Sequence, residues 1–246
     1  MPSIEHNKAL IRDFYRRCVA NGDLEFAHQL IADDYIQHSP LVKPGKTGLL
    51  EALAYMKQLP KPASSTQPFM RLIAEGDFVV THMAFSLGGQ SKVVVDLFRL
   101  HNGQIAEHWD AMEDQPETSR NGHSMLDGPG ETEDFSLTDS NKKMVGDFFQ
   151  RVLLPQAWDL LPDYVAPNLI QHNPAIADGL DGLTESVRAT TGGFAARKIH
   201  RMIGEGNFVV VQSEGPFREK PATFYDVFRL KAGLIVEQWQ VKQIVP

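Results

Sequence analysis

Apolar residues near the start of the chain recur every three or four positions, which predicts a helix. The apolar face of this helix comprises Leu10, Ile11, Phe14 and Cys18. Ser3 is a suitable N-cap, and the Asn21-Gly22 pair is a suitable stop. Shorter helices are expected at about 24–32 and 47–58. From about residue 140 the helical period returns, and its inward positions are Val145, Phe148, Phe149 and Val152.

After the third expected helix the pattern changes to extended apolar runs. Strands are expected at 69–75, 77–86, 91–100 and 104–113. Glu75-Gly76-Asp77 and Asn102-Gly103 are turn signals between neighbouring runs, so the strands should form an antiparallel meander. The Q-H-x-P segment (37–40) is expected to be a loop, because Pro40 restricts the residue before it to extended geometry. Helices followed by a meander predict an α+β fold with helices on one face of a curved sheet.

The whole pattern occurs twice. YIQHSP (35–40) returns as LIQHNP (169–174), which sets an offset of 134 residues between the two histidines. RLIAEGDFVV (71–80) returns as RMIGEGNFVV (201–210), at an offset of 130. The second copy therefore lacks four residues between about 50 and 70 of the first. Two offsets that each hold over tens of residues indicate a tandem duplication. A second short helix is expected at 156–166 in the second copy.

The segment between the copies is polar and rich in glycine, proline and acidic residues, and it has no apolar period. It has no counterpart inside either repeat. We therefore expect a first domain at 1–113, a linker at 114–135 and a second domain at 136–246.

Composition narrows the class of protein. The 246 residues, 42% of them hydrophobic, suffice for two packed domains of about 120 residues each. The net charge is −7 and no Lys/Arg cluster occurs, so a nucleic-acid partner is not expected. A single cysteine, Cys18, excludes an internal disulfide. No apolar run reaches the ~18 residues of a membrane span, and a soluble cytoplasmic protein is expected.

One acidic residue stands in an otherwise apolar strand. In VVVDLFRL (93–100), Asp96 shares a strand face with Val94, Phe98 and Leu100. Burying a carboxylate without partners is costly. Two interpretations remain: a carboxylate bonded to a loop backbone or an arginine, or a polar group that projects into a pocket. The second repeat keeps the acid as Asp226.

The last strand of the first repeat carries a second candidate group. In EHWD (107–110), Glu107 and Trp109 face one way and His108 and Asp110 face the other. A histidine and an acid side by side suit proton transfer, although an exposed polar strand face is the alternative. The second repeat reads EQWQ (237–240). Glutamine cannot take up a proton near neutral pH, so the titratable pair exists only in the first repeat.

Histidines elsewhere follow two patterns. His82 corresponds to Gln212, so a third proton-handling group is confined to the first half. His38 and His172 are kept in both halves, which fits either a structural role or a pocket-lining donor beside Asp96. We therefore expect the active pocket in the first domain and a degenerate second domain.

No signature of a metal or cofactor site is present. The chain lacks H-E-x-x-H, a cysteine pair and a calcium-type acidic loop. Gly88-Gly89 follows a strand without opening a helix, so it is no dinucleotide fingerprint. We expect no metal and no cofactor.

With these motifs, each half resembles the SnoaL-like polyketide cyclase family, within the nuclear-transport-factor-like and ketosteroid-isomerase-like superfamily. The resemblance rests on Q-H-x-P, I-A-E-G-D-F-V-V, V-D-L-F-R-L and G-Q-I-A-E-H-W-D and covers nearly all of each repeat. It implies two tandem cone-shaped α+β domains, each of three helices packed on a curved antiparallel sheet around a pocket. Family members commonly dimerise through the outer face of the sheet. The resemblance thus implies that the two halves pair as an intrachain pseudo-dimer, and a homo-oligomer is also compatible.

The resemblance also implies an activity. In cyclase members an acid on a late strand works as general acid/base without a cofactor, and Asp110 matches that acid. The expected function is a cyclase, lyase or isomerase that acts on a small apolar carbonyl compound. Asp110 abstracts an α-proton, His108 with His38 or His82 stabilises the enolate oxygen, and Asp96 orients one of these groups. The expected substrate-binding residues are His82, Trp109, Phe98, His172 and Asp226. Two alternatives are a non-catalytic small-molecule binding protein with the same pocket and a scaffold whose pocket is filled by side chains.

Overall fold

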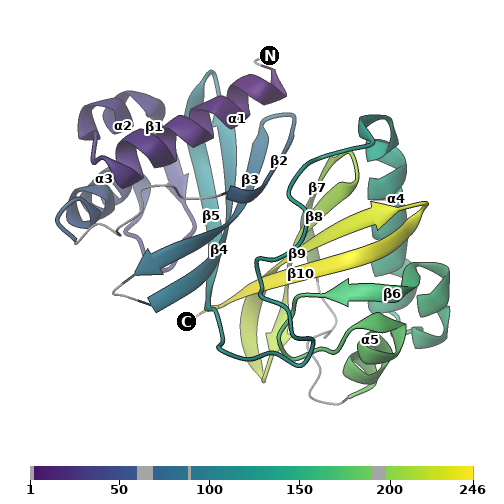
Figure 1. Cartoon of the computed structure of the whole chain (residues 1–246). Helices are drawn as coiled ribbons and strands as arrows, with labels where there is room; N and C mark the ends of the chain where they lie inside the picture. The colour runs from purple at the N-terminus through teal and green to yellow at the C-terminus, as the bar shows by residue number, and fades with distance from the viewer. Residues whose placement is uncertain (1–2, 60–68, 88–89, 190–197, 246) are drawn as a thin grey trace.

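The computed structural model describes residues 3–59, 69–87, 90–189 and 198–245. It contains two five-stranded sheets, and each sheet carries its own helices (Figure 1). The helices of each half lie on the face of their sheet that is turned away from the other half (Figure 1). The chain therefore forms two tandem α+β domains, as the alternation of apolar patterns predicts.

The first domain follows the expected order of elements. Its elements are α1 (Ile4–Asp13), the π-helical turn η1 (Phe14–Ala20), α2 (Leu24–Leu30), β1 (Ile31–Gln37), α3 (Gly45–Met56), β2 (Phe69–Glu75), β3 (Phe78–Leu87), β4 (Gln90–His101) and β5 (Gln104–Asp114). The Ser3 side chain caps α1 by accepting a hydrogen bond from the His6 N–H. Cys18 is buried in the core beneath the helices, and burial raises the pKa of its thiol to about 12.

The second domain repeats this order. Its elements are η2 (Phe135–Leu137), α4 (Thr138–Phe148), the π-helical turn η3 (Phe149–Leu153), η4 (Trp158–Asp163), β6 (Val165–Gln171), α5 (Gly179–Arg188), β7 (Lys198–Glu205), β8 (Phe208–Phe217), β9 (Lys220–Lys231) and β10 (Leu234–Ile244). The helix expected at 156–166 is a short 3₁₀ segment that contains Pro162. Proline lacks the N–H that an α-helix needs, which accounts for the tighter and shorter element.

One strand per domain was not expected from the sequence. The segment before Q-H-x-P forms this strand: β1 ends at Gln37 and pairs in parallel with β5, and β6 pairs in the same way with β10. Residues 38–40 lie outside β1, in agreement with the loop predicted there. The sheet orders are therefore β1-β5-β4-β3-β2 and β6-β10-β9-β8-β7. Proline restricts only the residue before it, Ser39, which lies two positions beyond the end of β1. The expected second helix is correspondingly shorter and stops at Leu30.

The outer faces of the two sheets pack against each other. A buried apolar cluster joins them: Ile73, Val80, Val93, Val95, Leu97, Trp109, Ala111 and Met125 with Ile203, Phe208, Val210, Tyr225, Val227, Trp239 and Val241. Each sheet therefore has an apolar inner face under its helices and an apolar outer face against its neighbour. Strands buried on both faces read as nearly continuous apolar runs, as β4 and β9 do.

Polar contacts across this interface follow an approximate two-fold symmetry. Glu205 accepts from Lys8 Nζ (2.5 Å) and from the Ala74 N–H (2.7 Å) of the first domain. Glu75 accepts from Lys142 Nζ (2.5 Å) and from the Gly204 N–H (2.8 Å) of the second. The same surface of each half thus meets its own copy, as in an isologous dimer interface.

Candidate functional site

The inner face of the first sheet borders a cavity of about 230 Å³ beneath the helices. Its walls are mostly apolar and include Phe14, Leu53, Met83, Val94 and Met112. The polar groups that reach it are Tyr15, Gln37, Ser39, Asp96, His108 and Asp110. An enclosed apolar space with a few convergent polar groups is typical of a small-molecule site.

Strand register brings the polar groups together. Asp96 on β4 lies directly opposite Asp110 on β5 and opposite Thr81 on β3. Gln37, the last residue of β1, pairs with His108 of β5. Opposite positions in neighbouring strands place side chains of one face within contact distance. The missed strand β1 is therefore the element that adds Gln37 to the site.

Asp96 is the centre of a buried hydrogen-bond network. Its Oδ1 accepts from His108 Nε2 at 2.8 Å. Its Oδ2 accepts from the Tyr15 hydroxyl and, at 3.3 Å, from the Thr81 hydroxyl. Burial and the neighbouring Asp96 raise the pKa of Tyr15 well above its usual value, so Tyr15 is a donor to the carboxylate. Three donors offset the cost of burying this acid.

His108 lies between two acceptors and against an aromatic ring. Its Nε2 contacts Asp96, its Nδ1 contacts Gln37 Oε1 at 3.0 Å, and its ring stacks on Phe98 with centroids 4.6 Å apart. Burial opposes a charge on the imidazole. The hydrogen bond and charge of Asp96, together with the charge of Asp110, outweigh burial and raise the pKa of His108. Both ring nitrogens are therefore occupied, and the ring has no free N–H for a substrate.

The Gln37 amide has a fixed orientation. Its Oε1 accepts from the Ser39 N–H at 3.1 Å and faces His108 Nδ1. Its Nε2 is buried and has no hydrogen-bond partner among the described residues. The hydroxyl of Tyr35 is likewise buried without a partner, and its pKa is raised by burial and by the charges of Asp110 and Asp96. Unpartnered buried donors are uncommon in folded proteins and call for an explanation.

Asp110 supplies the matching unpartnered acceptor. Its Oδ2 accepts from the Ser39 hydroxyl at 2.9 Å, whereas its buried Oδ1 has no partner among the described residues. Burial raises the pKa of Asp110, with a further contribution from the charge of Asp96 and an opposing one from His108. A carboxyl whose pKa is raised by an apolar site suits a general base or acid near neutral pH.

Several residues expected in the pocket lie elsewhere. His38 and Trp109 are on the outer side of β5: their rings stack with centroids 4.6 Å apart, and His38 Nε2 contacts Glu107 Oε1 at 2.8 Å. His82 also lies on the outer face, buried beside Arg71. The structure thus does not bring His38, His82 or Trp109 to Asp96, because alternate residues of a strand face opposite sides. Phe98 does line the cavity.

The second domain replaces the titratable groups by amides. Asp226 accepts from Gln238 Nε2 (3.3 Å) and from Gln240 Nε2 (2.7 Å), and Asn173 Nδ2 donates to Gln240 Oε1 (3.1 Å). Asp226 thus lies on the inner face, like Asp96. His172 lies on the outer side with Trp239, as His38 does with Trp109. Such a network holds its carboxylate in place without a group that exchanges protons near neutral pH.

Four polar residues of the site were missed from the sequence: Tyr15, Gln37, Ser39 and Thr81. A signal was present for three of them, because the second repeat replaces them by Phe149, Asn173 and Val211. A hydroxyl present in one repeat and absent from the other marks the half that carries the network. Gln37 gave no such signal, since Gln171 matches it.

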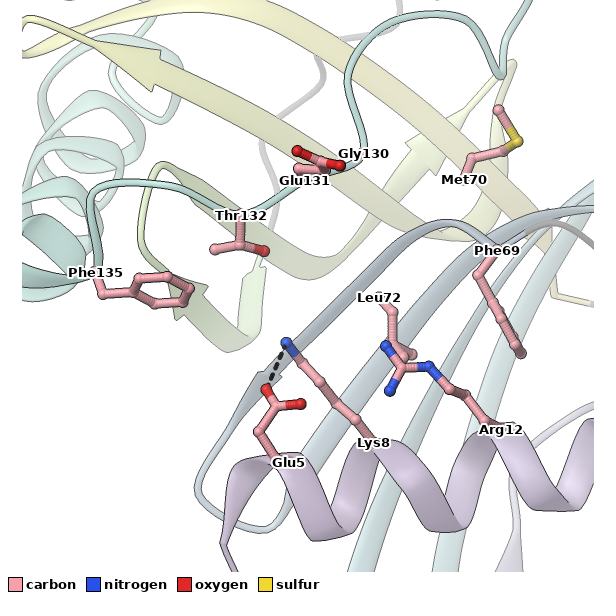
Figure 2. Close-up of a pocket in the computed structure, with 10 residues that line it drawn as sticks. All are labelled: Glu5, Lys8, Arg12, Phe69, Met70, Leu72, Gly130, Glu131, Thr132 and Phe135. Carbon is pink, nitrogen blue, oxygen red and sulfur yellow. Dashed lines mark ion pairs between the residues drawn. The ribbon is translucent and has the colours of Figure 1, made fainter.

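A larger surface pocket of about 540 Å³ lies between α1, β2 and the linker (Figure 2). Lys8 and Arg12 border it from α1, with Phe69 from β2 and Glu131 from the linker. Lys8 is bound to Glu205 and lies 3.6 Å from Glu5. The charge of Lys8 is therefore already paired, whereas the inner cavity is lined by residues with unpartnered polar atoms.

Within residues 3–59, 69–87, 90–189 and 198–245, no group of three His, Cys, Asp or Glu side chains is placed to hold a metal ion. In the same part of the chain, the helices are all too short or too polar to cross a membrane.

Comparison with solved structures gives matches that each cover one half of this chain. A putative ketosteroid isomerase from Kribbella flavida is 12% identical, with a TM-score of 0.40, over 45% of this chain and 82% of the other. A putative SnoaL-like polyketide cyclase from Jannaschia is 18% identical, with a TM-score of 0.37, over 47% and 92%. An LEH-like epoxide hydrolase from M. tuberculosis is 20% identical, with a TM-score of 0.36, over 43% and 84%. No curated protein matches the chain.

Comparison with protein families gives a match in each half. The SnoaL-like domain family matches residues 11–108 and again residues 145–238. These two regions contain the cavity network of the first domain and the amide network of the second, and together they span most of the chain. The chain belongs to the SnoaL-like domain family, of which it carries two copies in tandem.

Proposed function

We propose that the first domain is a cofactor-independent acid/base enzyme, of the cyclase, lyase or isomerase type, that acts on a small apolar carbonyl compound. The observation that carries this proposal is a pair of unpartnered buried groups on two residues that line one apolar cavity: Asp110 Oδ1, an acceptor, and Gln37 Nε2, a donor. Proton abstraction next to a carbonyl needs a base at the carbon and a donor at the oxygen.

Each residue has a role in this proposal. Asp110 removes the α-proton and returns it after the bond rearrangement. Gln37 donates to the oxygen on which negative charge develops, a role first expected of His108, whose nitrogens are already occupied. His108 and Asp96 act as positioning residues, because His108 holds Gln37 Oε1 and Asp96 holds His108. A fixed donor is effective because it does not reorganise during the reaction.

Cavity size limits the substrate. An apolar cavity of about 150 Å³ accommodates benzene, so about 230 Å³ suits one substituted ring or a chain of similar size. The apolar walls favour a neutral, weakly polar compound, and they also disfavour the Asp110 anion, which strengthens it as a base.

We further propose that the chain consists of a first domain at 1–113, a linker at 114–135 and a second domain at 136–246. The second domain is a catalytically degenerate partner, and the packed sheets form an intrachain pseudo-dimer. Gln238 and Gln240 in place of His108 and Asp110 support the loss of activity. The symmetric contacts of Glu75 and Glu205 support the pairing.

The test compares wild type with Asp110→Asn. A set of small cyclic and aromatic carbonyl compounds is first screened by thermal shift, because ligands raise Tm by mass action. Each compound that binds is then incubated in D₂O, and NMR follows deuterium uptake at the carbon next to the carbonyl. Wild type is expected to catalyse the exchange, and Asp110→Asn is expected to lose at least about a hundredfold of the rate, the usual scale of general-base catalysis.

Asp114→Asn is the matched control, since Asp114 lies on the same strand with a largely exposed side chain. Exchange that continues unchanged in Asp110→Asn contradicts the role of Asp110. Compounds that bind both proteins equally and undergo no exchange would identify a binding protein in place of an enzyme.

A further inference from the structure

Each domain contributes to a three-layer stack at the interface. In the first cluster, His38 stacks on Trp109 (4.6 Å, 6°) and the guanidinium of Arg201 lies 3.8 Å from the Trp109 ring. In the second cluster the same roles belong to His172, Trp239 and Arg71, with a stacking distance of 4.6 Å and a cation–ring distance of 3.7 Å. The arginine of each cluster comes from the opposite domain. We refer to these as the first and second His–Trp–Arg clusters.

The linker covers the second cluster and binds it through main-chain carbonyl oxygens. Ser124 O accepts from His172 Nδ1 at 2.8 Å. Asp127 O accepts from Trp239 Nε1 at 2.9 Å and from Arg71 Nη2 at 2.5 Å. All three members of the second cluster therefore donate to one short peptide segment.

Side chains of the linker complete this contact. Met125 lies in the sequence between Ser124 and Asp127, whose carbonyl oxygens accept these hydrogen bonds. Its side chain is buried in the apolar core that joins the sheets. The chain also passes so close to the cluster that a Cβ at Gly128 would lie 2.3 Å from Glu237 Oε1. Residues 124–127 form a turn here, in which the Ser124 N–H donates to Asp127 Oδ2. The linker is thus seated in a site that holds a peptide turn and one apolar side chain.

The first cluster presents the same donors without such a segment. Among the described residues, His38 Nδ1, Trp109 Nε1 and Arg201 Nη2 have no hydrogen-bond partner, and Arg201 Nη1 donates to Gln212. The three side chains border a cleft between the domains of about 400 Å³. The side chain of His38 is 39% exposed, whereas that of His172 is 1% exposed.

The walls of this cleft also differ from those of the linker site. Thr223 and Tyr225 stand where the first domain has Val93 and Val95. They make the floor of the cleft more polar than the floor of the linker site. The carboxylate of Glu107 beside His38 offsets part of the positive charge of the first cluster. A polyanionic ligand is therefore disfavoured, and neutral carbonyl oxygens are the acceptors that match these donors.

We propose that this cleft is a second binding site, which receives a peptide turn of another protein through its main-chain carbonyl oxygens, in the way that the linker binds the second cluster. The site is separate from the catalytic cavity, because His38 and Trp109 lie on the outer face of β5 and the cavity lies on the inner face. Asp110 borders both spaces, so the readout must report on the outer face alone.

The probe is a capped synthetic peptide with the sequence of residues 122–128, GHSMLDG. It is titrated into the ¹⁵N-labelled full chain, and the three tryptophan indole N–H signals are followed by NMR. A Trp109→Phe variant assigns the Trp109 signal. We expect a saturable shift of the Trp109 signal while those of Trp158 and Trp239 stay in place, since Trp239 is already bonded to the linker.

Two variants test the geometry. Arg201→Gln is expected to weaken the peptide about tenfold, the loss of one charge-assisted hydrogen bond. Thr223→Phe is expected to abolish binding by filling the cleft without touching the cluster. Arg188→Gln, which removes an exposed cation elsewhere, is the control and should leave the affinity unchanged.

Any of the following results would overturn the proposal. One is a Trp109 signal that does not move at several millimolar peptide. Another is a shift that persists in Thr223→Phe, or that appears only at Trp239. The third is an equal Trp109 shift with sodium acetate at the same concentration, which would assign the cleft to free carboxylates. None of these results bears on deuterium exchange by the first domain, so the two proposals can fail independently.

Discussion

At the residue scale, the first domain combines one carboxylate that is fully hydrogen-bonded with one that is not. Asp96 accepts from Tyr15, Thr81 and His108, whereas Asp110 has a single donor, Ser39. The two acids lie opposite each other on neighbouring strands but differ in their surroundings. Burial raises the pKa of Asp110, which suits this acid to the proposed proton transfer, whereas the three donors suit Asp96 to a positioning role.

The pKa shifts predict a bell-shaped pH dependence of kcat/KM. Asp110 acts as a base only when deprotonated, so the rate falls as the pH falls through its pKa, which is raised above the usual value of about 3.9. His108 holds Gln37 best as a cation, so the rate falls as the pH rises through its pKa, which is raised above about 6.5. A pH series of the deuterium-exchange rate measures both limbs.

The comparison for that series is His108→Gln, which copies the second domain at this position. Without the imidazolium, the alkaline limb should disappear and the acid limb should remain. Because the two groups interact, the observed values belong to the pair. An alkaline limb that survives in His108→Gln contradicts this assignment.

At the element scale, the π-helical turn η1 places Tyr15 over the sheet, and η3 places Phe149 at the equivalent point of the second domain. Inserted wide turns are often associated with functional sites. Here the wide turn positions a hydroxyl that the second domain lacks. Both domains therefore have the wide turn, and the Tyr15 hydroxyl oxygen is what distinguishes Tyr15 from Phe149 at this point.

Tyr15→Phe is expected to keep the fold, because Phe149 fits the same turn. It removes one of three donors to Asp96, so kcat should fall about tenfold, the loss of a hydrogen bond to a charged group. KM should change little, because Tyr15 acts on Asp96 in this proposal and does not bind the substrate. Steady-state kinetics of exchange separate the two constants, and a rise in KM at unchanged kcat would contradict a positioning role.

The helices α3 and α5 depend on a glycine in their first turns. A Cβ at Gly48 would lie 2.0 Å from Lys43 O, and one at Gly182 would lie 2.2 Å from Ala177 O. The close approach explains why both repeats have glycine at this position.

Gly48→Ala is therefore expected to lower the free energy of unfolding by about 1–3 kcal/mol, the usual cost of overpacking. Urea denaturation measures the change. Ala52→Gly in the same helix is the control, where the cost should be only about 1 kcal/mol from helix propensity. Equal stability of Gly48→Ala and wild type would contradict the close backbone contact.

At the scale of the whole molecule, the two domains share one apolar core between their sheets. Buried ion pairs frame this core, and their two copies differ in burial. The side chains of Lys8 and Glu205 are 7% and 6% exposed, whereas those of Lys142 and Glu75 are 26% and 33% exposed. The two ion pairs have the same Nζ–carboxylate distance of 2.5 Å but differ in burial. Each pair can therefore serve as the control for the other.

Glu205→Ala should destabilise the chain by about 3 kcal/mol, because it removes the buried charge partner of Lys8 and leaves only the exposed Glu5, 3.6 Å away. Glu75→Ala should cost about 1 kcal/mol or less, because water can solvate the released lysine. Urea unfolding of both variants at the same pH measures the difference. Equal losses would indicate that burial does not govern these pairs.

The sequence by itself determined the order of the elements, the duplication and the SnoaL-like fold. The order of the elements and the duplication follow from local periods and from two constant offsets, which do not depend on how the chain packs. The fold follows from the resemblance of the motifs to the SnoaL-like family. The sequence also placed Asp96 with Phe98 on one face of their strand and His108 with Asp110 on one face of the next, because alternation along a strand is fixed by its geometry. The repeat comparison predicted correctly that the titratable pair is present in one half alone.

Only the tertiary structure decided which groups meet across strands and domains. The Q-H-x-P trio recurs because its glutamine reaches His108 or Gln238 inside and its histidine stacks on Trp109 or Trp239 outside. The sequence could not separate these sides, because it did not predict the strand β1. Pairing in parallel with β5 is a non-local contact that no local pattern encodes. For the same reason, only the folded chain revealed that the linker covers one His–Trp–Arg cluster and leaves the other open.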